Sequence, residues 1–167
     1  MSILAAHVIT DEECTTVTVH RADTGKGLDD GQPNPAFWIA RLPETTGYLI
    51  VVHGGPKGGA YSLEVESPRE LRWERGTKTA EVKATLPANA VAAYVVPSSE
   101  KLAIELQAPG KDSYLTLEGL QGQPVVKATD NKQSFTGPVS HDNKDESIVR
   151  IHQGTQNGEF TLRVRQL

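Results

Sequence analysis

The sequence feature that most constrains the fold is a twenty-residue stretch that occurs twice. Residues 48–67 read YLIVVHGGPKGGAYSLEVES, and residues 147–166 read SIVRIHQGTQNGEFTLRVRQ. The two stretches align without a gap at an offset of 99. The identical pairs are His53 with His152, Gly55 with Gly154, Gly59 with Gly158, Leu63 with Leu162, and Val65 with Val164. Self-similarity at a fixed offset indicates a duplicated structural unit.

Each stretch predicts two β-strands. Two apolar runs flank a Gly-rich connection, which is typical of a β-hairpin. The second run alternates, because Tyr61, Leu63 and Val65 are separated by polar residues. A period of two places alternate side chains on opposite faces of a sheet. We therefore expect these three residues to be mostly buried, together with their counterparts Phe160, Leu162 and Val164.

The repeat extends upstream of both stretches. At an offset of 98, Leu4-Ala5 matches Leu102-Ala103, Val8 matches Leu106, and residues 17–19 match residues 115–117. Pro68 marks the join, and residues 69–100 have no counterpart in the first copy. Short strands with turn signals between them and no helical periodicity favour a sandwich. The sequence thus predicts an all-β protein of two related antiparallel β-sandwich (jelly-roll-like) units, with an abbreviated unit at 1–68 and a complete one at 69–167.

The expected strands fall into three groups. In the first copy we expect strands near 3–9, 15–21, 36–42, 47–53 and 60–66. In the inserted segment we expect them near 71–74, 79–86 and 91–96. In the second copy we expect them near 101–107, 113–118 and 124–128, and in the closing stretch. We expect residues 129–146 to form a polar loop, since they are rich in Asp, Asn, Gly and Pro. Trp38 and Trp73 are expected in the core, with an exposed binding platform as the alternative.

An abbreviated first copy has a consequence for its surface. Its sheet would expose an edge and an apolar face, which proteins normally cover. The candidates for the cover are residues 69–100 or a second chain in a homodimer. On the polar face, Glu64 and Glu66 of the first copy correspond to Arg163 and Arg165 of the second. These opposite charges would pair if the two stretches met, but independent solvated charges are the preferred interpretation.

Composition excludes several functions. The net charge is −4 and no run of five or more Lys or Arg exists, which argues against nucleic acid or a charged membrane surface as partner. The single cysteine, Cys14, forbids an intrachain disulfide. Apolar runs are far shorter than the roughly 20 residues of a membrane span. The first fourteen residues have no basic start and no long apolar core, so we expect no signal peptide in them.

Several motifs together resemble two bacterial families. The motifs are Trp73 to Gly76, Tyr94, the run Asp112-Ser113-Tyr114-Leu115, and the closing Gly158 to Val164. In that order they are similar to the pre-peptidase C-terminal (PPC) domain and to the periplasmic inhibitor of g-type lysozyme. The resemblance implies a periplasmic or secreted protein that binds another protein or a cell-wall polymer. From the sequence alone, a cytoplasmic location stays open.

The candidate site residues are polar loop residues. The resemblance supplies no key residue, so the best binding candidates are His141, Asp142, Asp145 and Glu146, in the polar loop of the second copy. Asp29 and Asp30 are the weaker candidates for calcium, which takes oxygen ligands from loops. Neither loop has the spacing of a known calcium loop, so solvated acidic turns are the preferred interpretation. No cofactor is expected beyond this calcium.

No residue is predicted to be catalytic. His53 and His152 could bind metal or transfer protons, but without nearby ligands we interpret them as polar residues at strand ends. Residues 54–59 are Gly-rich, yet a strand and not a helix follows, which argues against a phosphate loop. Ser140, His141 and Asp142 are adjacent, whereas triad members come from separate segments. We therefore predict a non-enzymatic binding module; the alternatives are a structural or adhesive accessory module and an unrecognised hydrolase.

Overall fold

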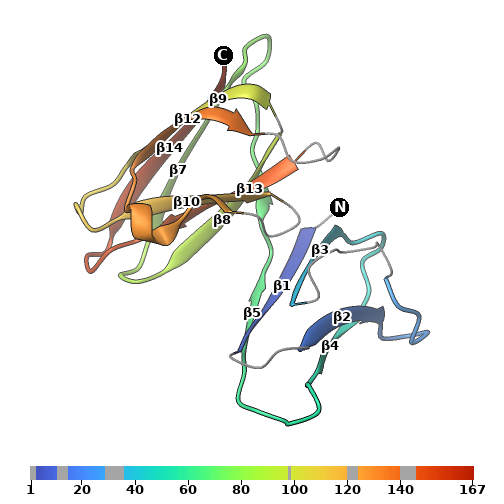
Figure 1. Ribbon diagram of the computed structural model, residues 1–167. Helices are drawn as coiled ribbons and strands as arrows, with labels where there is room; N and C mark the ends of the chain where they lie inside the picture. The colour runs from blue at the N-terminus through green and yellow to red at the C-terminus, as the bar shows by residue number, and fades with distance from the viewer. Residues whose placement is uncertain (1–2, 11–14, 29–35, 98, 120–123, 140–145) are drawn as a thin grey trace. The chain divides into compact units, whose positions relative to one another are not determined.

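The computed structural model describes residues 3–10, 15–28, 36–97, 99–119, 124–139 and 146–167. The chain is all-β and forms two compact units, Met1–Pro68 (unit 1) and Arg69–Leu167 (unit 2) (Figure 1). Within the described ranges, the one helical segment is a single 3₁₀ turn, η1 (Ala128–Asp130), and no helix is long and apolar enough to cross a membrane.

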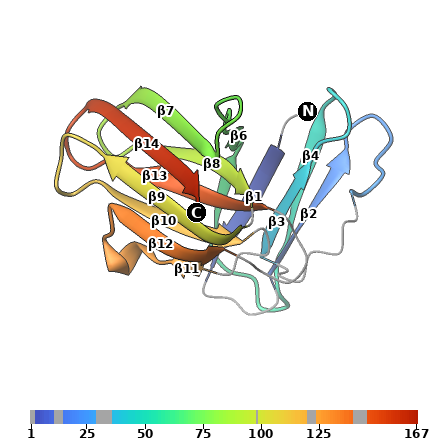
Figure 2. The ribbon, with the colours of Figure 1, turned by 90° about the horizontal axis from the view of Figure 1, so that it is seen from above.

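Unit 2 is a β-sandwich of two sheets. Its strands are β6 (Arg69–Glu70), β7 (Thr79–Leu86), β8 (Val91–Pro97), β9 (Ser99–Gln107), β10 (Tyr114–Gly119), β11 (Pro124–Val126), β12 (Ser134–Val139), β13 (Glu146–His152) and β14 (Gly158–Gln166). One sheet has the order β12-β9-β14-β7, and the other has β11-β10-β13-β8-β6 (Figure 2). All pairs are antiparallel except the short parallel pair of β6 and β8, which departs from the wholly antiparallel expectation.

The core of unit 2 lies between its two sheets. Phe160, Leu162 and Val164 of β14 are fully buried there, as their alternation predicts. Tyr94 of β8 meets Phe160 edge-on, with the ring centroids 6.3 Å apart. Trp73 packs against the same core. Strands β7 and β8 close this side of the core, each from its own sheet.

Unit 1 is a smaller sandwich with the same plan. Its strands are β1 (Ile3–Ile9), β2 (Thr16–Arg21), β3 (Phe37–Arg41), β4 (Tyr48–His53) and β5 (Ser62–Glu66). The sheets have the orders β3-β1-β5 and β2-β4, and Figure 1 shows β1 with β3 in one layer and β2 with β4 in the other. The buried side chains between them are Ala6, Val8, Val17, Val19 and Trp38. The sequence pattern predicted all five strands to within two residues at each end.

The sequence repeat is also a repeat of strand pairing. In the β2–β4 pair Thr16 lies opposite His53, and in the β10–β13 pair Tyr114 lies opposite His152. These are equivalent positions at the offsets of 98 and 99. The β1–β5 pair has the same register as the β9–β14 pair. The β1–β3 pair likewise corresponds to the β9–β12 pair. Unit 1 therefore contains the counterparts of β9, β10, β12, β13 and β14, and the contacts of Gly27 and Leu28 with β2 correspond to the pairing of β11 with β10. Among the described residues of unit 1, no strand corresponds to β6, β7 or β8.

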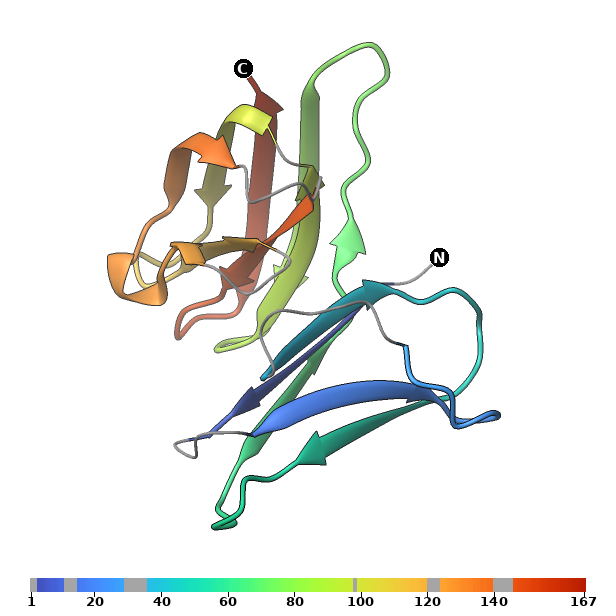
Figure 3. The same ribbon diagram turned by 45° about the vertical axis from the view of Figure 1, so that its right-hand side comes forward.

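The predicted hairpins are wrong. β4 and β5 lie in different sheets, and so do β13 and β14. Figure 3 shows the long Gly-rich connection that leaves β4 and returns into β5. Two consecutive strands in opposite sheets form a β-arch. The alternation of apolar residues shows that one face of a strand is buried, but it does not reveal which strand is the neighbour.

The expected loop at residues 129–146 is also wrong in part, because it contains β12. This strand includes Gly137 and Pro138, which suggested a turn. Proline has no backbone N–H, so in sheets it is confined to edge strands and bulges. β12 is the edge strand of its sheet, and its pairing with β9 shifts register between Gly137 and Val139. The edge position therefore explains how this sequence forms a strand.

Two further expectations concern contacts between the copies. The inserted segment contributes β6, β7 and β8 to the two sheets of unit 2. Arg163 forms an ion pair with Glu81 of β7 at 2.5 Å, and Arg165 one with Glu105 of β9 at 3.4 Å. Both arginines thus have partners in their own sheet, and their pairing with Glu64 and Glu66 stays a prediction.

Candidate binding surface

Most of the predicted site residues lie outside the described part of the chain. These are Asp29, Asp30, His141, Asp142 and Asp145, together with Cys14 and Ser140. Glu146 is described: it is the first residue of β13 and lies opposite Pro97 of β8. It belongs to a strand and not to the polar loop. The binding loop and the calcium site therefore stay predictions.

The two equivalent histidines make equivalent contacts. Nε2 of His53 lies 2.9 Å from the hydroxyl of Thr18, and Nε2 of His152 lies 3.1 Å from the hydroxyl of Thr116. Each threonine is on the strand next to its histidine. His152 also stacks on Tyr114, with the rings 4.5 Å apart and nearly parallel. Among the described residues, no three His, Cys, Asp or Glu side chains gather as metal ligands. The contacts join neighbouring strands, as expected for polar residues at strand ends.

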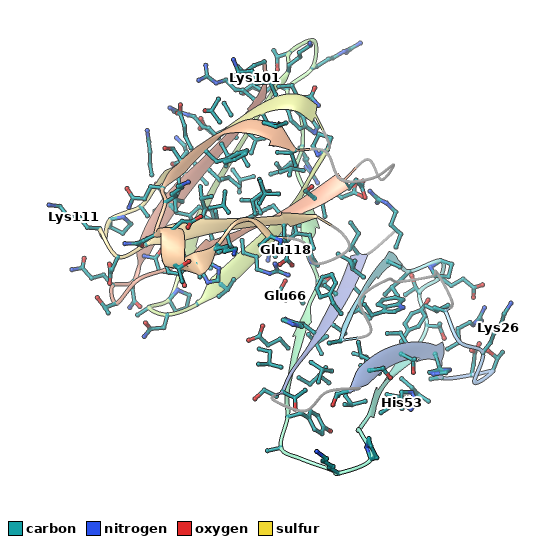
Figure 4. The ribbon with its side chains drawn as sticks, viewed as in Figure 1. Lys26, His53, Glu66, Lys101, Lys111 and Glu118 are labelled. Carbon is teal, nitrogen blue, oxygen red and sulfur yellow. The ribbon has the colours of Figure 1, made fainter. Side chains whose placement is uncertain are left out.

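A small cleft lies at one end of unit 2. Its volume is about 260 Å³, and Asp112, Tyr114, His152 and Thr155 are among its lining residues. The Asp112 carboxylate accepts hydrogen bonds from the backbone N–H of Thr155 at 2.7 Å and from its hydroxyl at 2.8 Å. These bonds lower the pKa of the Asp112 carboxyl below its usual value. The neighbouring Lys111 points into solvent (Figure 4). Asp112 thus holds the β13–β14 connection in place.

The distinctive surface of the molecule is where unit 1 lacks the counterparts of β7 and β8. Leu63 lies opposite Val8, and Val65 lies opposite Ala6, so both face the core of unit 1. Their side chains are nevertheless 37% and 49% exposed, and Tyr61 is 56% exposed. The counterparts Leu162, Val164 and Phe160 are each 0% exposed. The strip of Tyr61, Leu63 and Val65, with the outer sides of β4 and β5, is here named the open edge.

The backbone at the open edge is arranged for pairing. In unit 2, eight residues of β14 pair with β7, and seven residues of β13 pair with β8. In unit 1, β5 ends the order β3-β1-β5 and β4 ends the order β2-β4, within the described strands. Both sheets therefore end on the same side of the sandwich. Strand edges of this kind are templates for further strands.

The open edge also has a charge of its own. The outward side chains of β5 include Glu64 and Glu66, at the positions where β14 has Arg163 and Arg165. In unit 2, β7 places Glu81 opposite Arg163. The hydrogen bond that Arg163 donates to the Glu81 carboxylate lowers the pKa of that carboxyl. A strand added beside β5 would therefore face carboxylates where β7 faces arginines.

Comparison with known proteins gives similarities at the level of the fold. The structure is similar to Aeromonas hydrophila PliG, a periplasmic inhibitor of g-type lysozyme, at 10% identity and a TM-score of 0.47, covering 59% of this chain and 94% of that one. A mutant of Escherichia coli PliG, likewise a periplasmic inhibitor of g-type lysozyme, has 8% identity and a TM-score of 0.41, covering 59% of this chain and 96% of that one. Salmonella Typhimurium PliG has 9% identity and a TM-score of 0.40, covering 57% of this chain and 94% of that one. These inhibitors are the second family that the sequence resembles. No protein-family model and no curated protein sequence matches the chain.

Proposed function

We propose that this protein is a non-enzymatic binding module that takes strands of another protein at the open edge of unit 1. One observation carries the proposal: the core-facing side chains of β5 are about half exposed, while the same side chains of β14 are covered by β7 and β8. Burial of apolar surface stabilises an association by about 25 cal/mol per Å². Contiguous apolar patches on soluble proteins commonly mark binding sites.

The chemistry of the edge favours a protein over a cell-wall polymer. A strand edge presents backbone N–H and C=O groups at a spacing of about 3.3 Å per residue. An extended polypeptide supplies the matching groups, and its alternate side chains reach the apolar strip, which is the mode of β-strand addition. A glycan has neither this spacing nor apolar side chains on one face. Export to the periplasm or the cell exterior is part of the proposal, and rests on the sequence resemblance.

A peptide that imitates the missing strands tests the proposal. The probe is residues 79–97, the β7–β8 arch, synthesised with Glu81→Gln so that it has no charge at that position. Added to the full chain, it should slow hydrogen exchange of the β4 and β5 amides. Leu63→Asp with Val65→Asp should remove this protection, because a charge in the strip opposes burial. Equal exchange with and without the peptide would refute strand addition.

Peptidoglycan provides the opposing case. The chain should not sediment with insoluble peptidoglycan through the open edge, because strand addition requires an extended polypeptide as the ligand. Peptidoglycan binding that the Leu63→Asp, Val65→Asp chain loses would assign the edge to the wall polymer and contradict the proposal. The g-type lysozyme that the similar structures inhibit is a first natural protein to test as a ligand, with loss of binding in the same variant as the expected result.

A further inference from the structure

The geometry points to one kind of occupant: we propose that the open edge binds a β-arch of another protein, with a Lys or Arg side chain facing Glu64. This inference rests on the proposed function and specifies its partner. Three properties of the structure define the occupant: the way both sheets end, the strand register of unit 2, and the charge at position 64.

The ends of the two sheets require two strands. β5 and β4 are the counterparts of β14 and β13, whose neighbours in unit 2 are β7 and β8. β7 and β8 follow each other in the chain and are joined only by residues 87–90. One continuous segment of 19 residues, 79–97, therefore covers both edges and the core between them. A single added strand would cover one sheet of unit 1 and leave the other exposed.

The pairing in unit 2 gives the register of the occupant. Ala80 lies opposite Val164, Val82 opposite Leu162, and Ala84 opposite Phe160. By equivalence, small or apolar residues of the occupant face Val65, Leu63 and Tyr61. On the second strand, Tyr94 lies opposite Val149, the counterpart of Ile50, and reaches the aromatic ring of Phe160. An aromatic residue of the occupant would reach Tyr61 in the same way.

The charge at position 64 decides the polar side of the occupant. In unit 2, Glu81 lies opposite Arg163, and the two form an ion pair at 2.5 Å. Glu64 occupies the position of Arg163, so the complementary residue changes from Glu to Lys or Arg. Opposite charges across neighbouring strands stabilise a pair, while like charges directly opposite destabilise it. The occupant therefore has a basic residue where β7 has Glu81.

The same charge argues against a second copy of this chain. A β7–β8 arch from another copy would bring Glu81 against Glu64, two like charges. That arch is also already paired with β13 and β14 of its own unit. A foreign arch with a basic residue has neither disadvantage. Charge complementarity thus separates the two occupants, although their apolar faces could be the same.

The test compares two arch peptides on two proteins. The peptides are residues 79–97 with natural Glu81 and with Glu81→Arg, and the proteins are the full chain and its Glu64→Arg variant. Dissociation constants are measured by titration calorimetry. The unmodified chain should prefer the Glu81→Arg peptide by about three- to tenfold, and the Glu64→Arg chain should reverse the preference, as expected for one cross-strand charge pair. Glu159→Arg makes the same charge change on β14, whose edge is occupied by β7, and should leave both constants unchanged.

Several results would overturn the inference. Equal affinity of both peptides for both proteins would show that Glu64 does not face the occupant, and would leave strand addition itself intact. A shorter peptide of residues 79–86 contains the β7 strand alone. If this peptide and the 79–97 arch, both with Glu81→Arg, bound the full chain with equal affinity, the open edge would bind one strand and not an arch. Sedimentation showing a dimer in which the β4 and β5 amides are protected would assign the edge to a second copy. Absence of binding by all peptides, the neutral one included, would instead refute the proposed function.

Discussion

Val65 and Val164 occupy the same position in two copies of one strand, yet Val65 is 49% exposed and Val164 is completely buried. Each faces the core of its own sandwich and lies opposite a core residue of the neighbouring strand, Ala6 or Ile104. The difference comes from β7, which covers β14 and has no counterpart beside β5. Burial at this position is therefore a property of the neighbouring strand and not of the residue.

The first prediction compares the two equivalent leucines. Leu162→Ala should lower the free energy of unfolding of unit 2 by about 2–5 kcal/mol, because it leaves a cavity in a closed core. Leu63→Ala should cost unit 1 about 1 kcal/mol or less, since its side chain is already 37% exposed. Urea denaturation followed by hydrogen exchange in each unit measures both values. Similar losses in the two units would contradict the comparison.

The second prediction concerns Gly154 in the β13–β14 connection. A Cβ atom there would collide with the carboxyl group of Asp112. Gly154→Ala should destabilise unit 2 by about 1–3 kcal/mol, the usual cost of overpacking. Gly54→Ala is the control in the β4–β5 connection, because no atom lies within 4 Å of its Cβ position. Thermal melting of the two variants should differ accordingly; an unchanged melt of Gly154→Ala would mean that the loop adapts.

The third prediction is a pH dependence that comes from Asp112. The bonds from Thr155 lower the pKa of the folded carboxyl. This carboxylate therefore stabilises the fold fully above its unfolded pKa of about 3.9, and the contribution disappears as the pH falls through the lower folded value. Asp112→Asn should lower the melting temperature at neutral pH and reduce the loss of stability on acidification. Glu159→Gln serves as the control, and an acid-melting profile shared by both variants would contradict the role of Asp112.

The fourth prediction is that the open edge limits solubility. Leu63→Lys with Val65→Lys should raise the protein concentration at which the chain stays monodisperse, since inward charges on an edge strand block further pairing. Ser62→Lys with Glu64→Lys places two lysines on the outward face of the same strand and should help less. Light scattering across a concentration series measures this. Equal behaviour of the two variants would attribute any effect to net charge alone.

The strand positions could be predicted from the sequence because each strand shows its own alternation. Leu63 and Leu162 lie in the same pattern, and both strands were placed correctly. Their burial could not be distinguished, because β7 pairs with β14 across more than seventy residues of sequence and no local pattern records that pairing. β12 could not be predicted, because Pro138 resembles a turn signal unless the strand is known to lie at an edge. The residues proposed as a site lie outside the described residues except for Glu146, which lies in β13. The open edge was foreseen only as a gap in the first copy, from the missing counterpart of residues 69–100.

The opposite charges at Glu64 and Arg163 also bear on how a duplicated chain folds. Two copies of one domain joined in tandem offer two similar edges to a single β7–β8 arch, and pairing with the wrong edge is a characteristic error of repeat proteins. Glu81 is attracted by Arg163 and repelled by Glu64, so the arch is directed to its own unit before either core has closed. We therefore expect the difference between these two residues to disfavour the exchange of strands between neighbouring copies during folding.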